Sequence, residues 1–182
     1  MISDKNLYDA FRNGDIHAFE KLVIKYRHNL VYFIMQFVGN YHTSEDIAQE
    51  VFAYLYLHPE KYSNKYEFKT FLFLLGKRRA IDYLRKESRG VCKYLEEADV
   101  IDFHSMDELI DNNEKMIVIR KALEGLKSDY RQVLFLLYFN ELSIAETATV
   151  LDKSVASVKV MSHRAKKQLK QILDKGGVAY EI

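Results

Sequence analysis

The side chains best suited to bind a charged partner form two basic surfaces, one in each half of the chain. In the first half, a helix expected from about Glu67 to Lys86 is apolar nearly all round at its start and divides into two faces near its end. Four cations and one acid gather on the polar face: Arg78, Arg79, Asp82, Arg85 and Lys86. Cations arranged in a row can follow the phosphates of a nucleic acid.

A polar, aromatic loop precedes this helix and adds a second kind of contact. The loop runs from His58 to Tyr66, and with the start of the helix it supplies rings, an amide and a cation: Tyr62, Asn64, Lys65 and Phe71. Aromatic rings stack on unpaired bases, so the loop and the basic face together suit single-stranded or melted nucleic acid. The alternative, equally open on these residues, is that Tyr62, Tyr66 and Phe71 belong to the core and that the basic face is only solvated.

The second basic surface lies on a helix expected from Val155 to about Leu173. Between Lys153 and Leu173 the chain has six Lys or Arg and no Asp or Glu, a local charge of +6. The candidate contact residues are the capping serine and the small, polar or cationic residues that follow it: Ser154, Ala156, Ser157, Lys159, Val160, His163, Arg164 and Lys167. Small side chains allow close approach to base edges, and the cations further along can reach phosphates. With the short helix and tight turn before it, this pattern predicts a helix-turn-helix that reads the major groove of duplex DNA, rather than a generic hairpin with a cationic surface.

A compact acidic and amide patch is expected on another helix of the first half. Asp46, Gln49 and Glu50 fall together on one side of it, away from an apolar stripe around Val51. The patch is either a docking surface for a basic partner helix or an ordinary solvated face, and the residues alone slightly favour the second.

The elements that position these residues are helices, because one Pro and seven Gly leave few breaks in 182 residues. Asp15 can cap a helix that Gly39-Asn40 ends. The run Thr43 to Asp46 has the form of a capping box, with Thr43 as N-cap, and opens a second helix to about Leu57. Pro59 then breaks the chain before the basic helix. The fold class predicted is all-α.

The second half is predicted to hold four helices. The first lies around Lys115 to Leu123, and the next starts at Ser128-Asp129, with Tyr130, Val133, Leu134, Leu137 and Tyr138 as its apolar stripe. A second capping box, Ser143 to Glu146, opens a short helix that ends near Val150, and Leu151 to Ser154 form the tight turn. The long helix that follows is expected to bury one face: Val155, Val158, Met161, Ala165, Leu169 and Ile172.

Charge along the chain predicts two small domains and a connection. The net charge of +1 resolves into +3 over residues 1–86, −7 over 87–114 and +5 over 115–182. The middle segment has nine acids, two bases and no sustained periodicity, so it is interpreted as a flexible acidic linker. A neutral average therefore does not argue against a nucleic-acid partner.

Composition excludes several other classes of protein. A single Cys cannot form an internal disulfide and makes a structural zinc site improbable. The N-terminus lacks the apolar region of a signal peptide, and no apolar run approaches the roughly 18 residues of a membrane span, so a soluble cytoplasmic protein without membrane insertion is expected. The sequence has no phosphate-binding Gly loop and no metal-spaced His residues. We therefore expect no cofactor, no metal and no enzymatic activity.

Four motifs in order resemble the extracytoplasmic-function group of bacterial sigma factors, small subunits of RNA polymerase that keep the second and fourth conserved sigma regions. Ser44 to Phe52 is similar to the A-E-D-hydrophobic-x-Q-E-V-F signature of that group, and Phe68 to Lys86 to its W-L-x-x-I-A-x-N-x-x-x-D-x-x-R-K segment. Leu126 to Arg131 parallels L-P-x-x-x-R, and Ser143 to Ala165 parallels the helix-turn-helix that ends in T-V-K-x-x-x-x-R-A.

The resemblance implies a role for each surface. Asp46, Gln49 and Glu50 would dock on the clamp helices of core RNA polymerase, a basic coiled coil of its largest subunit. The loop and the basic helix end would melt and read the −10 element of promoter DNA, holding an extruded base, while the helix from Val155 reads the −35 element as duplex. The acidic connector would thread toward the polymerase active site, and an anti-sigma factor is a common partner in the group.

Some positions depart from the pattern of the group. Phe71 replaces the usual Trp, and Arg78 stands where Asn is usual, which puts the local −10 contacts in doubt. Lys127 and Asp152 replace a typical Pro and Gly, and Asp tolerates the left-handed turn conformation better than most residues.

Two rival functions remain at this point. A stand-alone helix-turn-helix regulator would use residues 1–86 to bind a ligand or to dimerise, but the basic face and the acidic linker are unexplained by it. An enzyme acting on nucleic acid would need clustered carboxylates for metal ions, and the acids of the linker do not offer them convincingly.

Overall fold

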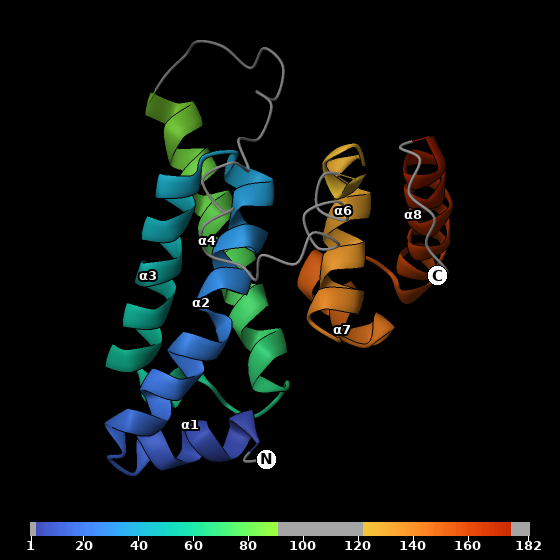
Figure 1. Ribbon diagram of the computed structural model, residues 1–182. Helices are drawn as coiled ribbons and strands as arrows, with labels where there is room; N and C mark the ends of the chain where they lie inside the picture. Colours follow the sequence, from blue (N-terminus) through green and yellow to red (C-terminus); the bar gives the residue numbers. More distant parts are fainter. Residues whose placement is uncertain (1–2, 91–121, 176–182) are drawn as a thin grey trace. The chain divides into compact units, whose positions relative to one another are not determined.

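The computed structural model describes residues 3–90 and 122–175, and every element in these ranges is helical (Figure 1). The chain divides into two compact units, Met1–Asp102 and Phe103–Ile182. The all-α prediction is confirmed. Most of the predicted acidic linker and of the helix expected around Lys115 lies outside the described residues.

The first unit begins with a helix that the sequence patterns did not predict, α1 (Asp4–Arg12). The Ser3 side chain caps it by accepting a hydrogen bond from the Asn6 amide at 3.2 Å. Tyr8 is fully buried, and its hydroxyl donates to the Leu55 carbonyl at 3.3 Å. A helix of nine residues is not stable alone in water, so this tertiary contact keeps α1 in place.

Helix α2 (Ile16–Val38) has the ends that were predicted. The Asp15 carboxylate accepts from the Ala18 amide at 3.2 Å, and Gly39 ends the helix with φ of 77°, a conformation that favours glycine. Helix α2 packs against α1, α3 and α4, and Figure 1 shows α1 lying across one end of the bundle formed by the three longer helices.

Helix α3 (Tyr41–Leu57) begins before the position that was predicted. Asn40, not Thr43, is the N-cap: its side-chain oxygen accepts from the Thr43 amide at 3.0 Å and from the Thr43 hydroxyl at 3.1 Å. The capping box prediction was therefore wrong by one helical turn. With Asn40 as N-cap, Thr43 is the third residue of the helix, and its amide is one of the first-turn donors that a cap must satisfy.

Helix α4 (Phe68–Gly90) follows a short 3-10 turn, η1 (Pro59–Lys61), and runs four residues beyond the predicted end at Lys86. It packs closely on α2 at Gly76, where an added Cβ would lie 2.7 Å from the Cδ1 atom of Leu30. Because Leu30 is fully buried, its methyl group has little room to move. Glycine at this position thus sets how closely α2 and α4 approach.

The second unit contains α6 (Ser128–Leu134), a π-helical turn η3 (Phe135–Phe139), α7 (Ile144–Leu151) and α8 (Val155–Lys175). Its core groups buried and partly buried apolar side chains: Leu123, Leu126, Tyr130, Leu134, Phe139, Ala165, Leu169 and Ile172. The π turn was not predicted. Two predicted core residues, Val155 and Tyr138, are instead 44% and 52% exposed.

The turn between α7 and α8 matches the sequence prediction closely. Both halves of the Ser143–Glu146 capping box are formed. Asp152 adopts the left-handed conformation with φ of 56° and ψ of 50°, as expected of an Asp in place of Gly. The Lys153 ammonium, next along the turn, lies 3.3 Å from the Asp129 carboxylate of α6. The helix-turn-helix is thus fixed at both helix ends.

We predict that Asn40→Ala lowers the free energy of unfolding by about 1 kcal/mol, because it removes the acceptor for the first turn of α3. Urea unfolding of the full chain followed by circular dichroism measures the change. Ser63→Ala, at an exposed loop position, serves as the control and is expected to have no effect. Equal stability of Asn40→Ala and the wild type would contradict the assigned cap.

Candidate nucleic-acid and protein interfaces

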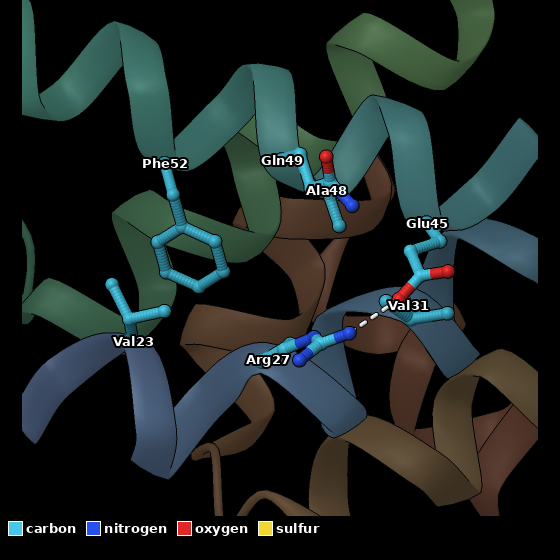
Figure 2. Close-up of a pocket in the computed structure, with 7 residues that line it drawn as sticks. All are labelled: Val23, Arg27, Val31, Glu45, Ala48, Gln49 and Phe52. Atoms are coloured by element: carbon cyan, nitrogen blue, oxygen red, sulfur yellow. Dashed lines mark hydrogen bonds and ion pairs between the residues drawn. The ribbon is translucent and has the colours of Figure 1, made fainter. Parts of the chain in front are cut away.

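The acidic and amide patch predicted on α3 is exposed. Asp46, Gln49 and Glu50 all face solvent, while the opposite face of α3 buries Ile47 and Val51. The neighbouring Glu45 differs from these three residues, because its carboxylate already forms an ion pair with Arg27 of α2 (Figure 2). The structure therefore places the three predicted residues together and leaves two carboxylates and an amide available to a partner.

A pocket that sequence reasoning missed adjoins this patch (Figure 2). It has a volume of about 310 Å³ and lies between α2 and α3, lined by Val23, Arg27, Val31, Glu45, Ala48, Gln49 and Phe52. Gln49 belongs to both the patch and the pocket. The periodicity of one helix in the sequence cannot predict a pocket between two helices, because the depth of the pocket depends on how closely the two helices pack.

Tyr62 does not present its ring to solvent, so its predicted role in stacking on a base is wrong for this structure. Its side chain is 1% exposed, with the ring 5.0 Å from that of Tyr8 and 5.6 Å from that of Phe68. Burial, with smaller effects from nearby charges, raises the pKa of Tyr62 to about 12. The ring is held here because α1 covers it, and α1 was not among the predicted helices. Phe71 is half-buried beside it, at 5.4 Å between ring centroids.

The tip of the loop between α3 and α4 is exposed. Ser63, Asn64 and Lys65 face solvent, and Asn64 adopts a left-handed conformation with φ of 58°. The Lys65 ammonium lies 5.3 Å from the centre of the Tyr66 ring. Below the tip, the Tyr62 hydroxyl donates to the Tyr66 carbonyl at 3.0 Å. Asn64 and Lys65 are thus accessible, as predicted, on a loop closed by a buried tyrosine.

The basic end of α4 is exposed except at one arginine. The side chains of Arg78 and Arg85 are 80% and 70% exposed, and Asp82 lies between them at 4.0 Å and 3.7 Å. Lys86 is also exposed. The Arg79 guanidinium instead packs 5.1 Å from the centre of the Tyr54 ring of α3 and is half-buried. The predicted face therefore exists, with Arg79 at its inner edge.

A residue that sequence reasoning missed, Arg12, connects α1 to the loop. Its Nε donates to the Pro59 carbonyl at 3.0 Å, and one terminal nitrogen donates to the Tyr62 carbonyl at 2.5 Å. No local pattern identifies such a residue, since its partners lie 47 and 50 positions away.

Helix α8 presents the outer face that was predicted. Seven of the eight named residues are exposed: Ser154, Ala156, Lys159, Val160, His163, Arg164 and Lys167. The Ser154 hydroxyl accepts from the Ser157 amide at 3.1 Å and so starts the helix. Ser157 is half-buried and directs its hydroxyl toward the Met161 sulfur at 3.6 Å. The inner face carries Val158 and Ala165, both fully buried.

Within residues 3–90 and 122–175, no group of three or more His, Cys, Asp or Glu side chains is placed to hold a metal ion. No helix in the described part of the chain combines the length and apolar character needed to cross a membrane.

Comparisons with known families match both halves of the chain. Residues 22–90 match Sigma-70 region 2, and residues 116–169 match Sigma-70 region 4. Among curated relatives, the ECF RNA polymerase sigma factor SigW of Bacillus subtilis is 28% identical over 174 residues, covering 89% of this chain and 92% of its own length. SigX of the same organism is 29% identical over 163 residues, covering 86% and 84%. The ECF sigma-E factor of Escherichia coli K12 is 24% identical and covers 93% of each chain.

Solved structures share the fold. CnrH, solved in complex with the cytosolic domain of CnrY, aligns with a TM-score of 0.62 at 21% identity, covering 94% of this chain and 97% of CnrH. The sigma factor RpoE from Bartonella quintana, solved with the anti-sigma factor NepR, aligns with a TM-score of 0.61 at 18% identity, covering 87% and 98%.

The order of the two matched regions, the length over which the relatives align and the helical architecture of both units agree with one another. The chain therefore belongs to the sigma-70 family of RNA polymerase sigma factors, in its extracytoplasmic-function group.

Proposed function

We propose that this sigma factor directs promoter-specific initiation through three of its surfaces: the α3 patch docks on core RNA polymerase, the α4 end with its loop opens the −10 element, and α8 reads the −35 element. The observation that carries the proposal is that region 2 and region 4 occur in one chain and that each presents an exposed, charged helix face. The stand-alone regulator is set aside, because residues 22–90 match region 2, where that alternative needs a ligand-binding or dimerisation domain.

Docking on polymerase is supported by the chemistry of the α3 patch. Asp46 and Glu50 offer two exposed carboxylates to a basic coiled coil, and such charge complementarity speeds association and fixes orientation. The pocket beside Gln49 has apolar walls from Val23 and Phe52. An apolar side chain from the same basic helix would fit there, in the way that anchor residues occupy pockets at interface centres.

Opening of the −10 element is supported by the exposed cations of α4 and by the loop tip. Arg78, Arg85 and Lys86 lie on one face, where they can follow phosphates. Asn64 and Lys65 offer an amide and a cation to an unpaired base. Because Tyr62 is buried, the half-buried Phe71 is the ring of the predicted pair that an unpaired base could reach.

Reading of the −35 element is supported by the outer face of α8. Ala156 and Val160 are small or apolar, and can meet base edges and thymine methyl groups. Lys159, Arg164 and Lys167 supply the cations for phosphates or guanines.

Bond formation belongs to the polymerase, so this chain acts by binding and positioning alone. RpoE of Bartonella quintana was solved with an anti-sigma factor, and we expect a protein of that kind to hold this chain inactive until its promoters are needed.

We predict that Asp46→Lys with Glu50→Lys weakens binding to core polymerase by about tenfold or more, because like charges then face the basic partner. Titration with labelled core enzyme measures the affinity. Glu20→Lys, a single charge reversal at an exposed position of α2 outside the patch, is the control and is expected to keep the wild-type affinity. Wild-type affinity of the double variant would remove α3 from the docking surface.

We predict that Arg164→Ala and Lys167→Ala each weaken binding of holoenzyme to duplex −35 DNA and reduce the slope of log K against log salt by about 1, if each cation meets one phosphate. Lys175→Ala, at the last turn of α8, is expected to leave the slope unchanged. A slope that is the same in all variants would exclude phosphate contacts at 164 and 167.

The complete proposal is tested by run-off transcription with core polymerase on a genomic DNA library. We expect specific transcripts only when the sigma factor is added, with two shared sequence elements upstream of their starts. No added transcript, or binding of the chain to duplex DNA as a dimer without polymerase, would contradict it.

A further inference from the structure

The loop between α3 and α4 is attached to α1 through one side chain, Arg12. Its guanidinium reaches two backbone carbonyls at the two ends of the η1 turn, that of Pro59, its first residue, and that of Tyr62, which follows its last. Hydrogen bonds from a charged donor are stronger than neutral ones, and the planar guanidinium fixes the relative positions of both acceptors. Arg12 thus holds the start of the exposed tip at a fixed distance from the end of α3.

Tyr62 connects the two ends of the same tip. Its carbonyl accepts from Arg12, while its hydroxyl donates to Tyr66. The residue therefore links α1 to both ends of the segment 62–66, and its ring cannot turn because it is packed against Tyr8 and Phe68. The three residues between Tyr62 and Tyr66 are the exposed ones, and Asn64 among them already has the left-handed backbone that makes the bend.

Arg12 is itself held in place before any partner binds. Its guanidinium lies 5.7 Å from the centre of the Tyr8 ring, and a terminal nitrogen lies 3.8 Å from the Asp9 carboxylate. Helix α1 is anchored on α2 by Asp4, whose carboxylate pairs with Lys25 at 2.5 Å and accepts from the Tyr26 hydroxyl. The chain of contacts from α2 through α1 to the loop is continuous.

We propose that Arg12 is a positioning residue for promoter opening: it pre-forms the tip 63–65 so that an unpaired base meets a fixed surface. This inference rests on the proposed role of the loop at the −10 element. A loop that orders only on binding loses conformational entropy at that moment, which weakens capture of the base, whereas a pre-formed loop does not. Helix α1, although it lies outside the region 2 match, then contributes to recognition without touching DNA.

The experiment compares Arg12→Met, Arg12→Lys and the control Lys5→Met in the full chain. Met keeps the apolar stem and removes both hydrogen bonds, Lys keeps the charge without the two-pronged geometry, and Lys5 is an exposed cation of the same helix. Hydrogen exchange of the free protein measures loop order without polymerase or DNA. Holoenzyme assembly, its salt dependence on fork-junction DNA and run-off transcription then measure the consequence.

For Arg12→Met we expect faster exchange at residues 62–66 with unchanged exchange in α3 and α4, holoenzyme assembly within about twofold of wild type and transcription lowered by about tenfold. Preference for the captured −10 base is expected to broaden. Arg12→Lys should recover the transcription only in part, and Lys5→Met should match the wild type.

Several results would overturn the proposal. Unchanged exchange in the loop, or unchanged transcription and base preference, would show that Arg12 does not position the tip. If transcription falls in proportion to holoenzyme assembly or to the unfolding temperature, the role of Arg12 is merely structural. A salt slope reduced by about 1 on fork-junction DNA would make Arg12 a phosphate contact instead. Failure of the wild-type chain to support transcription would contradict the proposed function itself, while the exchange measurement would still decide whether Arg12 orders the loop.

Discussion

The packing of three rings, those of Tyr8, Tyr62 and Phe68, joins the parts of the first unit on which its surfaces depend. Tyr8 belongs to α1, Tyr62 to the loop and Phe68 to the first turn of α4, and the ring centroids lie 5.0 to 5.6 Å apart. Aromatic pairs at such distances contribute about 0.5 to 1.5 kcal/mol each beyond the burial of their area. Because the cluster contains the loop's only buried side chain, moving Tyr62 would release the exposed tip and remove one of the contacts that hold α1.

Local sequence signals predicted most helices and their exposed faces, but they did not predict that Tyr62 belongs to this cluster. The helices α2, α3, α7 and α8 follow from local signals, since caps such as Asp15 and Ser143 and the left-handed Asp152 act within a few residues. The exposed faces of α3 and α8 follow from helical periodicity, because each helix buries one side only. Tyr62 could not be assigned in this way: a ring in a polar loop has no periodicity, and only the position of α1 decides that it is buried.

Non-local packing also accounts for the other differences. The pocket between α2 and α3, the two carbonyl contacts of Arg12 and the stacking of Arg79 on Tyr54 each join residues from different elements. The π turn η3 is a local difference instead: the amide and side chain of Asn140 both donate to the Phe135 carbonyl, five residues earlier, at 3.2 Å. Tyr138 lies within this turn and is exposed instead of belonging to the predicted core.

The repulsion between neighbouring cations is reduced in different ways on the two basic helix faces. On α4, Asp82 lies between Arg78 and Arg85 and offsets part of their charge, so this face is only moderately positive without a partner. Helix α8 has no acid before Asp174 in its last turn, and its neighbours relieve the repulsion instead: the Lys166 ammonium lies 4.6 Å from the centre of the Tyr138 ring, and Lys153 pairs with Asp129. Burial raises the pKa of Tyr138, but hydrogen bonding to Lys166 and Ser162 and the charge of Lys166 outweigh it and lower the pKa overall. Exposed cations on α8 that lack such neighbours gain most from a polyanion, since phosphates supply the compensating charge that the free protein does not.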